Sequence, residues 1–400
     1  MLARQSNYRS QTLNLIASEN VMSPTVESFF RAELSHRYGD YLGSDIQQRK
    51  YTGNRFITPI DAMAQASFQD LFGCRFADVR PLSGHVAGSA VIMALCAPGD
   101  AVLELDSAGG GHRLAGKLSQ AALCPLRVLP LPFDAKNYNI AIKEAVAMIA
   151  LERPKLVVLG SSLFLFPHPV RELADAVHAV GGYLLYDASH VLGLIAGGAF
   201  PNPLTQGADV VISSTHKTFA GPQGGVLLTN DEDLYERLVP AIYPALVTNH
   251  HLHRLPALIA VCNEWQEFGP AHVAAVVAGA KALGAALSDA GLDVIGQANE
   301  FTQSHTLLIS CANAKSDAAR LEEAGIMVTP VGLPPALGAG ALRLGVQEVT
   351  RLGFVPEHAP RVAALIAETL GQTRPLDEIS DLVADLVANY TECRFTWVQA

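Results

Sequence analysis

Short apolar runs recur along the first two-thirds of the chain, and most of them are continuous rather than alternating. Continuous runs are typical of parallel strands that are buried on both faces of a sheet. Amphipathic stretches such as 170–180 lie between them, so strand and helix alternate. We therefore predict an α/β fold with a mostly parallel central sheet in a large domain. Its predicted strands are 101–106, 155–160, 183–187, 209–213 and 225–229.

The last third of the chain has a different pattern. A helix-like segment at 252–269 leads into an alanine-rich helix at 271–290, and strands near 305–311 and 341–346 precede a terminal helix at 360–370. We interpret this portion as a smaller α+β domain packed on the first, because 400 residues exceed one ordinary core. The predicted division is an N-terminal arm (1–49), a large domain (50–255), and linking helices with a small C-terminal domain (256–400).

Composition narrows the classes of function. Half of the residues are hydrophobic and 16% are charged, which suits buried parallel strands and a large subunit interface. The formal net charge of −10 argues against nucleic acid as a partner. No apolar run reaches membrane-spanning length and the start lacks a signal-peptide profile, so we expect no membrane partner. The six cysteines have no paired spacing, which indicates reduced thiols in a cytoplasm.

Lys217 is the first candidate for chemistry. The apolar run before it breaks into hydroxyl side chains, and a glycine-rich turn follows it. A buried strand would thus deliver the amine to the edge of a sheet, where partial burial lowers the pKa of a lysine and exposes a nucleophile. The pattern indicates a lysine that forms a Schiff base. The alternative is a surface lysine in a turn.

Asp187 ends an earlier apolar run, and His190 follows three residues later. A carboxylate at the carboxyl end of a parallel strand points into the crevice where α/β proteins bind ligands. Beside a pyridinium nitrogen, such an acid keeps the ring of pyridoxal phosphate protonated, so that the ring acts as an electron sink. His190 would lie over or beside that ring. The alternatives are a helix N-cap for Asp187 and a hydrogen-bonded core histidine for His190.

Two glycine-containing turns complete the pattern. Ser83 and Gly84 open an apolar helical stretch with His85 directly after them, and such a turn binds phosphate through backbone N–H groups. The same residues also cap ordinary helices. Three glycines precede His112, so the backbone can approach a ligand and the imidazole is suited to stack on a planar ring. A mobile surface loop is the alternative for this second turn.

Together these segments resemble serine hydroxymethyltransferase and its relatives among the fold-type I pyridoxal-phosphate enzymes. The resemblance runs from Leu-Ile-Ala-Ser-Glu-Asn at 15–20 to Ala-Leu-Arg-Leu-Gly at 341–345. It includes Arg-Pro-Lys-Leu at 153–156 and the Asp-Ala-Ser-His segment at 187–190. Because these segments occur in the same order at nearly the same separations, they are more specific than any one motif. The resemblance implies pyridoxal 5′-phosphate as the cofactor.

The resemblance also implies a role for each residue near the cofactor. Lys217 holds the cofactor as an internal aldimine, Asp187 pairs with its pyridine nitrogen and His112 stacks on its ring. Relatives have a small residue at the position of His85. The other implied contacts are Ser162 and His190 near the 3-hydroxyl group, and Ser83, Gly84 and His85 in the phosphate loop.

The resemblance further implies how the substrate and a second subunit are engaged. Ser18 and Arg343 hold the substrate carboxylate, a task that suits the rigid fork of an arginine. Tyr38 reaches the cofactor of a neighbouring subunit, which implies a homodimer or a dimer of dimers. Where the family has Tyr-Ala-Glu, this chain has an acid one methylene shorter, Asp40. We expect Asp40, or a water that it holds, to deprotonate the β-hydroxyl group of the substrate.

Other departures fall on the positions that meet folate or a partner subunit. One of the family's paired tyrosines becomes Thr52, and the Asn-Lys-Asn-Thr-Ile-Pro segment becomes Thr-Pro-Val-Gly-Leu-Pro at 329–334. The Gln-Gly-Gly-Pro turn, which meets the cofactor phosphate across the dimer, is replaced by a turn with Thr248 and Asn249. These two side chains still offer donors to phosphate, but the close approach that glycine permits is lost. Tetrahydrofolate is therefore a doubtful co-substrate.

His250, His251, His253 and Arg254 form a dense basic cluster. Imidazole is a common metal ligand, but no nearby carboxylate or cysteine in the sequence completes a site. An anionic group of the substrate or cofactor is a better partner, and a solvated helix start is the simplest explanation. We predict no metal.

The leading hypothesis is an enzyme that makes or breaks the Cα–Cβ bond of a β-hydroxy amino acid of the serine/glycine type, through an external aldimine and a quinonoid. The main alternative is a folate-independent aldolase or transaldolase of the threonine or α-methylserine type, because the folate contacts are eroded. An aminotransferase would accumulate pyridoxamine phosphate. A catalytically silent paralogue is disfavoured because Lys217, Asp187, His112 and Arg343 are all present.

Overall fold

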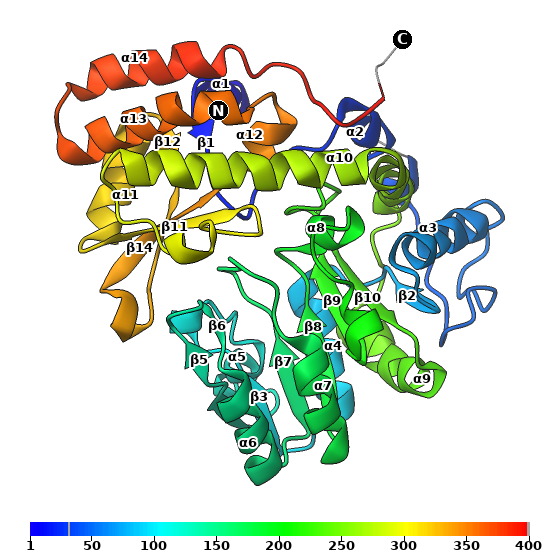
Figure 1. Ribbon diagram of the computed structural model, residues 1–400. Coiled ribbons are helices and arrows are strands. Elements are labelled where there is room, and N and C mark those ends of the chain that lie inside the picture. The colour runs from blue at the N-terminus through cyan, green and yellow to red at the C-terminus, as the bar shows by residue number, and fades with distance from the viewer. Residues whose placement is uncertain (31–32, 398–400) are drawn as a thin grey trace.

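The computed structural model describes residues 1–30 and 33–397. At its centre is a seven-stranded sheet in the order β2-β10-β9-β8-β7-β3-β4 (Figure 1). The strands from β9 to β4 are parallel, whereas β10 runs antiparallel to both β9 and β2. The predicted α/β fold with a mostly parallel sheet is therefore confirmed. The strands are β2 (Phe76–Asp78), β3 (Ala101–Glu104), β4 (Arg127–Pro130), β7 (Leu156–Leu159), β8 (Tyr183–Asp187), β9 (Val210–Ser214) and β10 (Gly225–Thr229).

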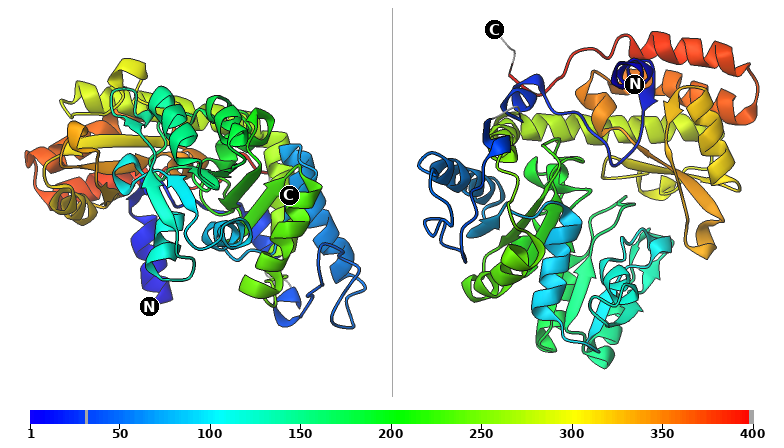
Figure 2. Two further views of the ribbon diagram at one scale, coloured as in Figure 1. Left: turned by 90° about the horizontal axis from the view of Figure 1, so that it is seen from below. Right: turned by 180° about the vertical axis from the view of Figure 1, so that it is seen from behind.

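Both faces of this sheet are buried, which explains the continuous apolar runs. Leu227 of β10 packs in one core, while its neighbours Val226 and Leu228 pack in the other. Helix α7 covers the face seen in Figure 1, and α4 covers the face seen from behind in Figure 2. The helices of this domain are α3 (Ile57–Phe72), α4 (Gly84–Leu95), α5 (Leu114–Gln120), α6 (Ile142–Glu152), α7 (Val170–Ala179), α8 (Leu192–Ala196) and α9 (Glu232–Pro240).

A second, smaller sheet carries the C-terminal part of the chain. Its central strand β14 is antiparallel to β11 on one side and to β13 on the other. All six residues of β14 are buried, because helices cover the sheet (Figure 1). The elements are β11 (Thr306–Cys311), β13 (Thr329–Val331), β14 (Gly340–Gly345), α11 (Ala314–Glu323), α12 (Gln347–Arg351), α13 (Ala359–Gly371) and α14 (Leu376–Val387).

The two sheets are linked by one long helix, α10 (Arg254–Asp289). The sequence predicted two helices that break near Pro270, and this prediction was wrong. The 36-residue helix continues through the proline because it packs along its length against α2, α3 and α13. Among the described residues, α10 is also the one helix whose length and composition would suffice to cross a membrane, but much of its apolar stretch is buried inside the protein.

The N-terminal arm contains more regular structure than its polar sequence indicated. It forms α1 (Leu2–Ser10), α2 (Pro24–Phe30) and the short strand β1 (Leu13–Asn14), which pairs in parallel with β12 (Ile326–Met327) of the C-terminal part. The three-part division of the chain stays a prediction. Further short elements are β5 (Phe133–Asp134), β6 (Asn139–Ile140), the π-helical turn η4 (Ala241–Leu246) and the 3-10 turns η1 (Glu33–His36), η2 (Ser107–Gly109), η3 (Pro203–Gln206), η5 (Gln297–Asn299), η6 (Pro335–Leu337) and η7 (Pro356–His358).

Candidate active site

A cavity of about 200 Å³ lies at the carboxyl ends of β7, β8 and β9. This is the position where open α/β sheets bind ligands. Most of the predicted cofactor residues meet there, although they come from segments more than a hundred residues apart. The lining residues are Ser83, Gly84, His85, His112, Ser161, Ser162, Asp187, Ser189, His190, Ser214, His216 and Lys217.

Lys217 stands in the loop that joins β9 to β10. The loop is closed by backbone hydrogen bonds, since the Thr215 N–H donates to the Gly224 carbonyl at 3.1 Å. The Thr218 hydroxyl next to the lysine donates to the His190 carbonyl at 3.0 Å, which ties the loop to the end of β8. Burial lowers the pKa of Lys217 below its ordinary value of 10.5, Asp187 opposes this and Arg343 adds to it. A larger fraction of the amine is therefore neutral and nucleophilic.

Asp187 is the last residue of β8, between the neighbouring strands β7 and β9. Its Oδ1 atom accepts a hydrogen bond from the Ser189 N–H at 2.9 Å. Gly160, at the end of β7, has φ +141°, and a Cβ atom there would lie 2.7 Å from the Asp187 Cβ atom. The glycine thus makes room for the carboxylate. The N-cap alternative does not hold for the next helix, because α8 has Val191 at that position.

Ser83 caps α4, whose first turn forms one wall of the cavity. The Ser83 hydroxyl accepts a hydrogen bond from the Val86 N–H at 3.1 Å. A Cβ atom on Gly84 would lie 2.6 Å from the Ser189 hydroxyl and 2.7 Å from the Ser214 nitrogen. Only glycine therefore lets the helix start so close to the ends of β8 and β9. The cap that we considered as an alternative is real, and the first residues of the helix, Gly84 and His85, line the cavity.

His85 and His112 face each other across the cavity wall. The His85 Nδ1 and His112 Nε2 atoms are 3.3 Å apart, and the Lys117 amine lies 3.3 Å from the His112 Nδ1 atom. Burial lowers the pKa of both imidazoles, and the Lys117 charge lowers each of them further. Both rings are therefore neutral near pH 7. A neutral imidazole is suited to stack on an aromatic ring.

Arg343 reaches this region from β14 of the smaller sheet. Its Nη1 atom donates to the Ser162 carbonyl at 2.9 Å, and its Nη2 atom lies 3.5 Å from the Thr329 hydroxyl. Burial lowers the pKa of Arg343 to about 10, so the guanidinium stays charged at neutral pH. Among the described residues its buried Nε atom has no hydrogen-bond partner.

His190 is buried beside Arg343 and Lys217. Burial lowers the pKa of His190 well below its ordinary value, and the nearby lysine and arginine lower it further. Its Nδ1 atom also lacks a partner within the described part of the chain. Buried polar atoms normally have a hydrogen-bond partner, so these nitrogen atoms are donors or acceptors that a ligand would satisfy. The residues present fit a phosphorylated pyridine aldehyde.

Several cavity residues were not predicted from the sequence. Ser161, Ser189 and His216 follow the ends of β7, β8 and β9, and Ser214 is the last residue of β9. Their positions at the ends of apolar runs were the available signal. His305 precedes β11 and stacks on His190 with ring centroids 6.3 Å apart. Its Nε2 atom is 3.1 Å from the Ala17 carbonyl, and burial lowers its pKa to about 3.

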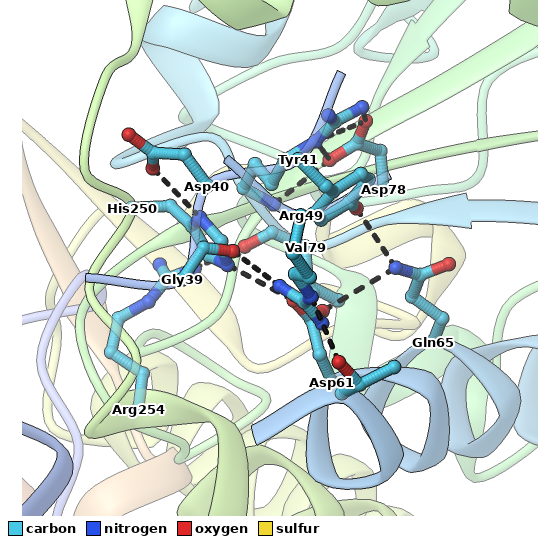
Figure 3. Close-up of polar contacts among 12 residues, drawn as sticks. Gly39, Asp40, Tyr41, Arg49, Asp61, Gln65, Asp78, Val79, His250 and Arg254 are labelled. Atoms are coloured by element: carbon cyan, nitrogen blue, oxygen red, sulfur yellow. Dashed lines mark hydrogen bonds and ion pairs between the residues drawn. The ribbon is translucent and has the colours of Figure 1, made fainter. Parts of the chain in front are cut away.

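The remaining predicted residues do not line this cavity. Ser18 is half-buried next to Ala17, whose backbone packs against β14. Tyr38, Asp40, Thr248 and Asn249 belong to a separate group, which we call the outer cluster. It comprises the 38–41 segment, the 247–250 loop and the side chains of Arg49, Asp61 and His250 that join them (Figure 3).

The outer cluster includes part of the histidine-rich segment that precedes α10 in the sequence. His250 is fully buried, whereas His251 and His253 stack on each other with ring centroids 5.6 Å apart. Among residues 1–30 and 33–397, no group of three or more His, Cys, Asp or Glu side chains is arranged to hold a metal ion. The buried histidine has carboxylate neighbours that are distant in sequence.

Comparisons with known proteins agree with this geometry. Residues 1–366 match the family model described as serine hydroxymethyltransferase. The chain belongs to the serine hydroxymethyltransferase family. It is 38% identical over 397 residues to serine hydroxymethyltransferase of Sulfolobus acidocaldarius, covering 97% of this chain and 91% of the relative. It is 40% identical over 408 residues to that of Korarchaeum cryptofilum, covering 96% and 93%.

A solved structure extends the comparison to the three-dimensional fold. The chain is similar to L-threonine transaldolase from Pseudomonas fluorescens in the internal aldimine state, with a TM-score of 0.92 and 26% identity. The match covers 99% of this chain and 92% of that protein. Family membership and this neighbour indicate that the chain is a transferase that depends on pyridoxal 5′-phosphate.

Proposed function

We propose that this enzyme makes or breaks the Cα–Cβ bond of a β-hydroxy amino acid of the serine/glycine type and so moves a one-carbon unit. One observation carries the proposal: the amine of Lys217 and the guanidinium of Arg343 come from different sheets yet lie close enough for the arginine to lower the pKa of the lysine. A reactive amine and a carboxylate-binding fork then act on one small amino acid.

In this proposal, each of the cofactor residues contacts a different part of the cofactor. When bound, pyridoxal phosphate supplies an electron sink for the carbanion left at Cα. Lys217 would hold its aldehyde carbon, Asp187 would face its ring nitrogen and His112 would stack on its ring. The phosphate would lie at the first turn of α4, with Ser83, Gly84 and His85. Ser162 and His190 would lie near the ring hydroxyl group.

Substrate orientation decides which bond breaks. Arg343, helped by Ser18, would hold the substrate carboxylate, and the bond perpendicular to the cofactor ring is the one that is weakened. The Thr329 hydroxyl and the Ser162 carbonyl, which contact the Arg343 guanidinium, fix the direction of that fork. A fixed carboxylate leaves the Cα–Cβ bond of the β-hydroxy amino acid in the reacting position.

A second subunit would complete the site. Tyr38 and Asp40 lie in the outer cluster rather than in the cavity, and we propose that they serve the cavity of a neighbouring subunit in a homodimer or dimer of dimers. The same surface exposes several large apolar side chains, as expected for an interface. They are Tyr38, Leu42, Tyr51, Phe56 and Met63.

Proton transfer at the β-hydroxyl group would fall to Asp40. Burial alone would raise the pKa of Asp40, but the His250 side chain and the Asn249 N–H lower it below its ordinary value, so the group is a carboxylate at neutral pH. Its side chain is only 3% exposed in the single chain. We therefore propose that Asp40 receives the proton through a water rather than by direct contact.

The proposal also places the enzyme in one-carbon metabolism of the cytoplasm. All six cysteines are free thiols, which supports a reducing compartment.

The test measures formation of glycine from L-serine by the purified holoenzyme, together with methylenetetrahydrofolate when tetrahydrofolate is present and free formaldehyde when it is absent. Faster turnover with tetrahydrofolate is the expected result and establishes serine–glycine interconversion. If L-serine is not cleaved under either condition, the proposed activity is wrong.

A threonine aldolase or transaldolase activity is the second candidate. The similarity to L-threonine transaldolase favours it, as does Thr52 at a position where the family has an aromatic residue. L-threonine would be supplied with benzaldehyde as a second aldehyde. Formation of acetaldehyde and a new aryl β-hydroxy amino acid, without any response to tetrahydrofolate, would favour the transaldolase over the hydroxymethyltransferase.

A further inference from the structure

His250 is a buried imidazole between two carboxylates. Its Nε2 atom is 3.1 Å from the Asp61 Oδ2 atom, and its Nδ1 atom is 3.6 Å from the Asp40 Oδ1 atom (Figure 3). The first contact is a hydrogen bond and the second is an ion-pair distance. All three side chains are at most 3% exposed. A buried histidine placed in this way links three segments of the chain: the 38–41 segment, α3 and the loop before α10.

Asp61 is fixed on α3 by further contacts. The Arg49 Nη1 atom lies 3.3 Å from its Oδ2 atom, and the Gln65 amide donates to its Oδ1 atom at 3.4 Å. Arg49 also donates to the Gly39 carbonyl, so the same guanidinium ties α3 to the segment that carries Asp40. Asp61 is therefore the anchored end of the Asp40–His250–Asp61 bridge.

The other end of the bridge holds the loop. The Asp40 carboxylate lies close to the backbone N–H groups of Asn249 and His250, which lower its pKa. Asn249 has φ +53°, the left-handed conformation that the family's glycine would adopt freely and that asparagine tolerates better than most residues. Thr248 is exposed and Asn249 half-exposed. The loop thus keeps a glycine-like backbone and presents two polar side chains outward.

The charges around His250 favour its protonated form. Burial alone would lower the pKa of His250, but Asp40 and Asp61 raise it above its ordinary value. The Arg80 charge works in the opposite direction, and Arg80 is itself held by Asp78 at 2.5 Å. The ionisable groups around His250 are Asp40, Tyr41, Arg49, Asp61, Asp78, Arg80, His251 and Arg254.

We infer that Asp61 and His250 are positioning residues that act through Asp40: the bridge fixes the 247–250 loop so that Thr248 and Asn249 meet the phosphate of the cofactor bound to the neighbouring subunit. This inference rests on the proposed shared site. It gives Asp40 a task besides proton transfer. It also explains how a turn without the family's two glycines can present donors to an anion. The buried ion pairs would hold the backbone in a conformation that the glycines would otherwise permit.

The test compares the release of two cofactors that differ only in the phosphate. Full-length His250→Asn and Asp61→Asn enzymes are loaded with pyridoxal 5′-phosphate or with pyridoxal, and dissociation is followed by absorbance after dilution. We expect each variant to release pyridoxal 5′-phosphate about tenfold faster than the unaltered enzyme, the effect of losing a hydrogen bond to a charged group. The release of pyridoxal should not change.

Two outcomes would overturn the inference. Equal acceleration for both cofactors would mean a general loosening of the site, and no acceleration for either would mean that the loop does not meet the phosphate. His178→Asn and Asp70→Asn are matched controls, because both residues are exposed, His178 pairs with Asp209 rather than with the bridge, and Asp70 lies on the same helix as Asp61. Neither control should change the release of either cofactor.

A further variant guards against misfolding. Thr248→Ala alters an exposed side chain and leaves the buried bridge intact. It should also accelerate only the release of pyridoxal 5′-phosphate, and combining it with His250→Asn should add less than the sum of the two effects. An unchanged release in Thr248→Ala would contradict the inference. Because release is measured without turnover, failure to cleave L-serine would refute the proposed activity alone.

Discussion

The Lys217 cavity and the outer cluster both consist of charged side chains and histidines, but they are assembled in different ways. In the cavity, Lys217, Asp187 and His112 are brought together by the ends of adjacent strands and a nearby glycine-rich turn, and the group is complete within one chain. In the outer cluster, Asp40, His250 and Asp61 are joined by buried ion pairs, and none of them lines the Lys217 cavity. In the proposed assembly the sheet edge would hold the cofactor, whereas the outer cluster would contribute Asp40, Thr248 and Asn249 to the site of a neighbouring subunit.

Most departures from the family lie outside the residues that hold the cofactor ring. Lys217, Asp187, His112 and Arg343 are kept, whereas the family's residues are replaced at His85, Thr52, the 329–334 segment and, in the outer cluster, Asp40, Thr248 and Asn249. If the inferred Asp40–His250–Asp61 bridge holds the backbone of the outer cluster, side chains there can differ from the family's without loss of its geometry. The following predictions test whether the two regions are as separate as this comparison makes them.

The largest effect is expected from Lys217→Ala. Loss of the amine removes the covalent link to the cofactor, and cleavage of L-serine should fall by about 10³-fold or more. The absorbance band of the lysine-bound cofactor should disappear as well. Lys143→Ala, an exposed lysine on α6, is the control. A Lys217→Ala enzyme that keeps both the band and the activity would remove Lys217 from the cavity chemistry.

A smaller loss is expected from Asp40→Asn. If Asp40 takes the β-hydroxyl proton, cleavage of L-serine should fall by about 10²-fold. Exchange of the glycine α-proton with solvent should stay unchanged, because glycine has no β-hydroxyl group. Asp45→Asn, an exposed acid on the same segment, should affect neither reaction. Equal losses in both reactions would mean that the outer cluster acts only through the structure of the cavity.

Arg343→Lys tests the binding of the substrate carboxylate by the residue that the smaller sheet contributes. A lysine keeps the charge but loses the second parallel hydrogen bond to the carboxylate. The KM for L-serine should rise by about 10- to 100-fold, with a smaller change in kcat. Steady-state kinetics with L-serine would measure both constants. A fall in kcat at constant KM would show that Arg343 does not bind the ground-state carboxylate.

The smallest effect concerns the titration of Lys217. Burial lowers its pKa below 10.5, while Asp187 raises it and Arg343 lowers it. Since the neutral amine is the reacting form, Asp187→Asn should move the midpoint of imine formation to lower pH, and Arg343→Gln should move it to higher pH. The rate of pyridoxal-phosphate binding to apoenzyme as a function of pH gives these midpoints. Identical midpoints in all three proteins would contradict electrostatic contact among these groups.

The sequence predicted the cavity well because its signals are local. A buried strand that ends in Asp187 and another that leads to Lys217 place both groups at one sheet edge without any knowledge of tertiary contacts. The strand bounds 183–187 and 225–229 agree with β8 and β10. The family resemblance added Arg343, which comes from a different sheet.

The outer cluster and α10 could not be predicted in the same way. Asp40, Asp61 and His250 are far apart in sequence, and each alone has an ordinary setting, so only folding shows that they form a bridge. Pro270 normally ends or kinks a helix at a cost of about 3 kcal/mol. In α10 the contacts with α3 before it and α13 after it outweigh that cost, and such contacts are not visible in local propensities.

Helix α10 connects the region of the 247–250 loop to the smaller sheet. Its 36 residues follow a helical path of about 54 Å, which begins shortly after His250, changes direction (Figures 1 and 2) and ends in the part of the chain that carries Arg343. Pro270 has no N–H to donate to the carbonyl of Gln266, so stiffness is lowest near that turn. The part of α10 before that turn can therefore keep the 247–250 loop in place while the part after it follows the smaller sheet.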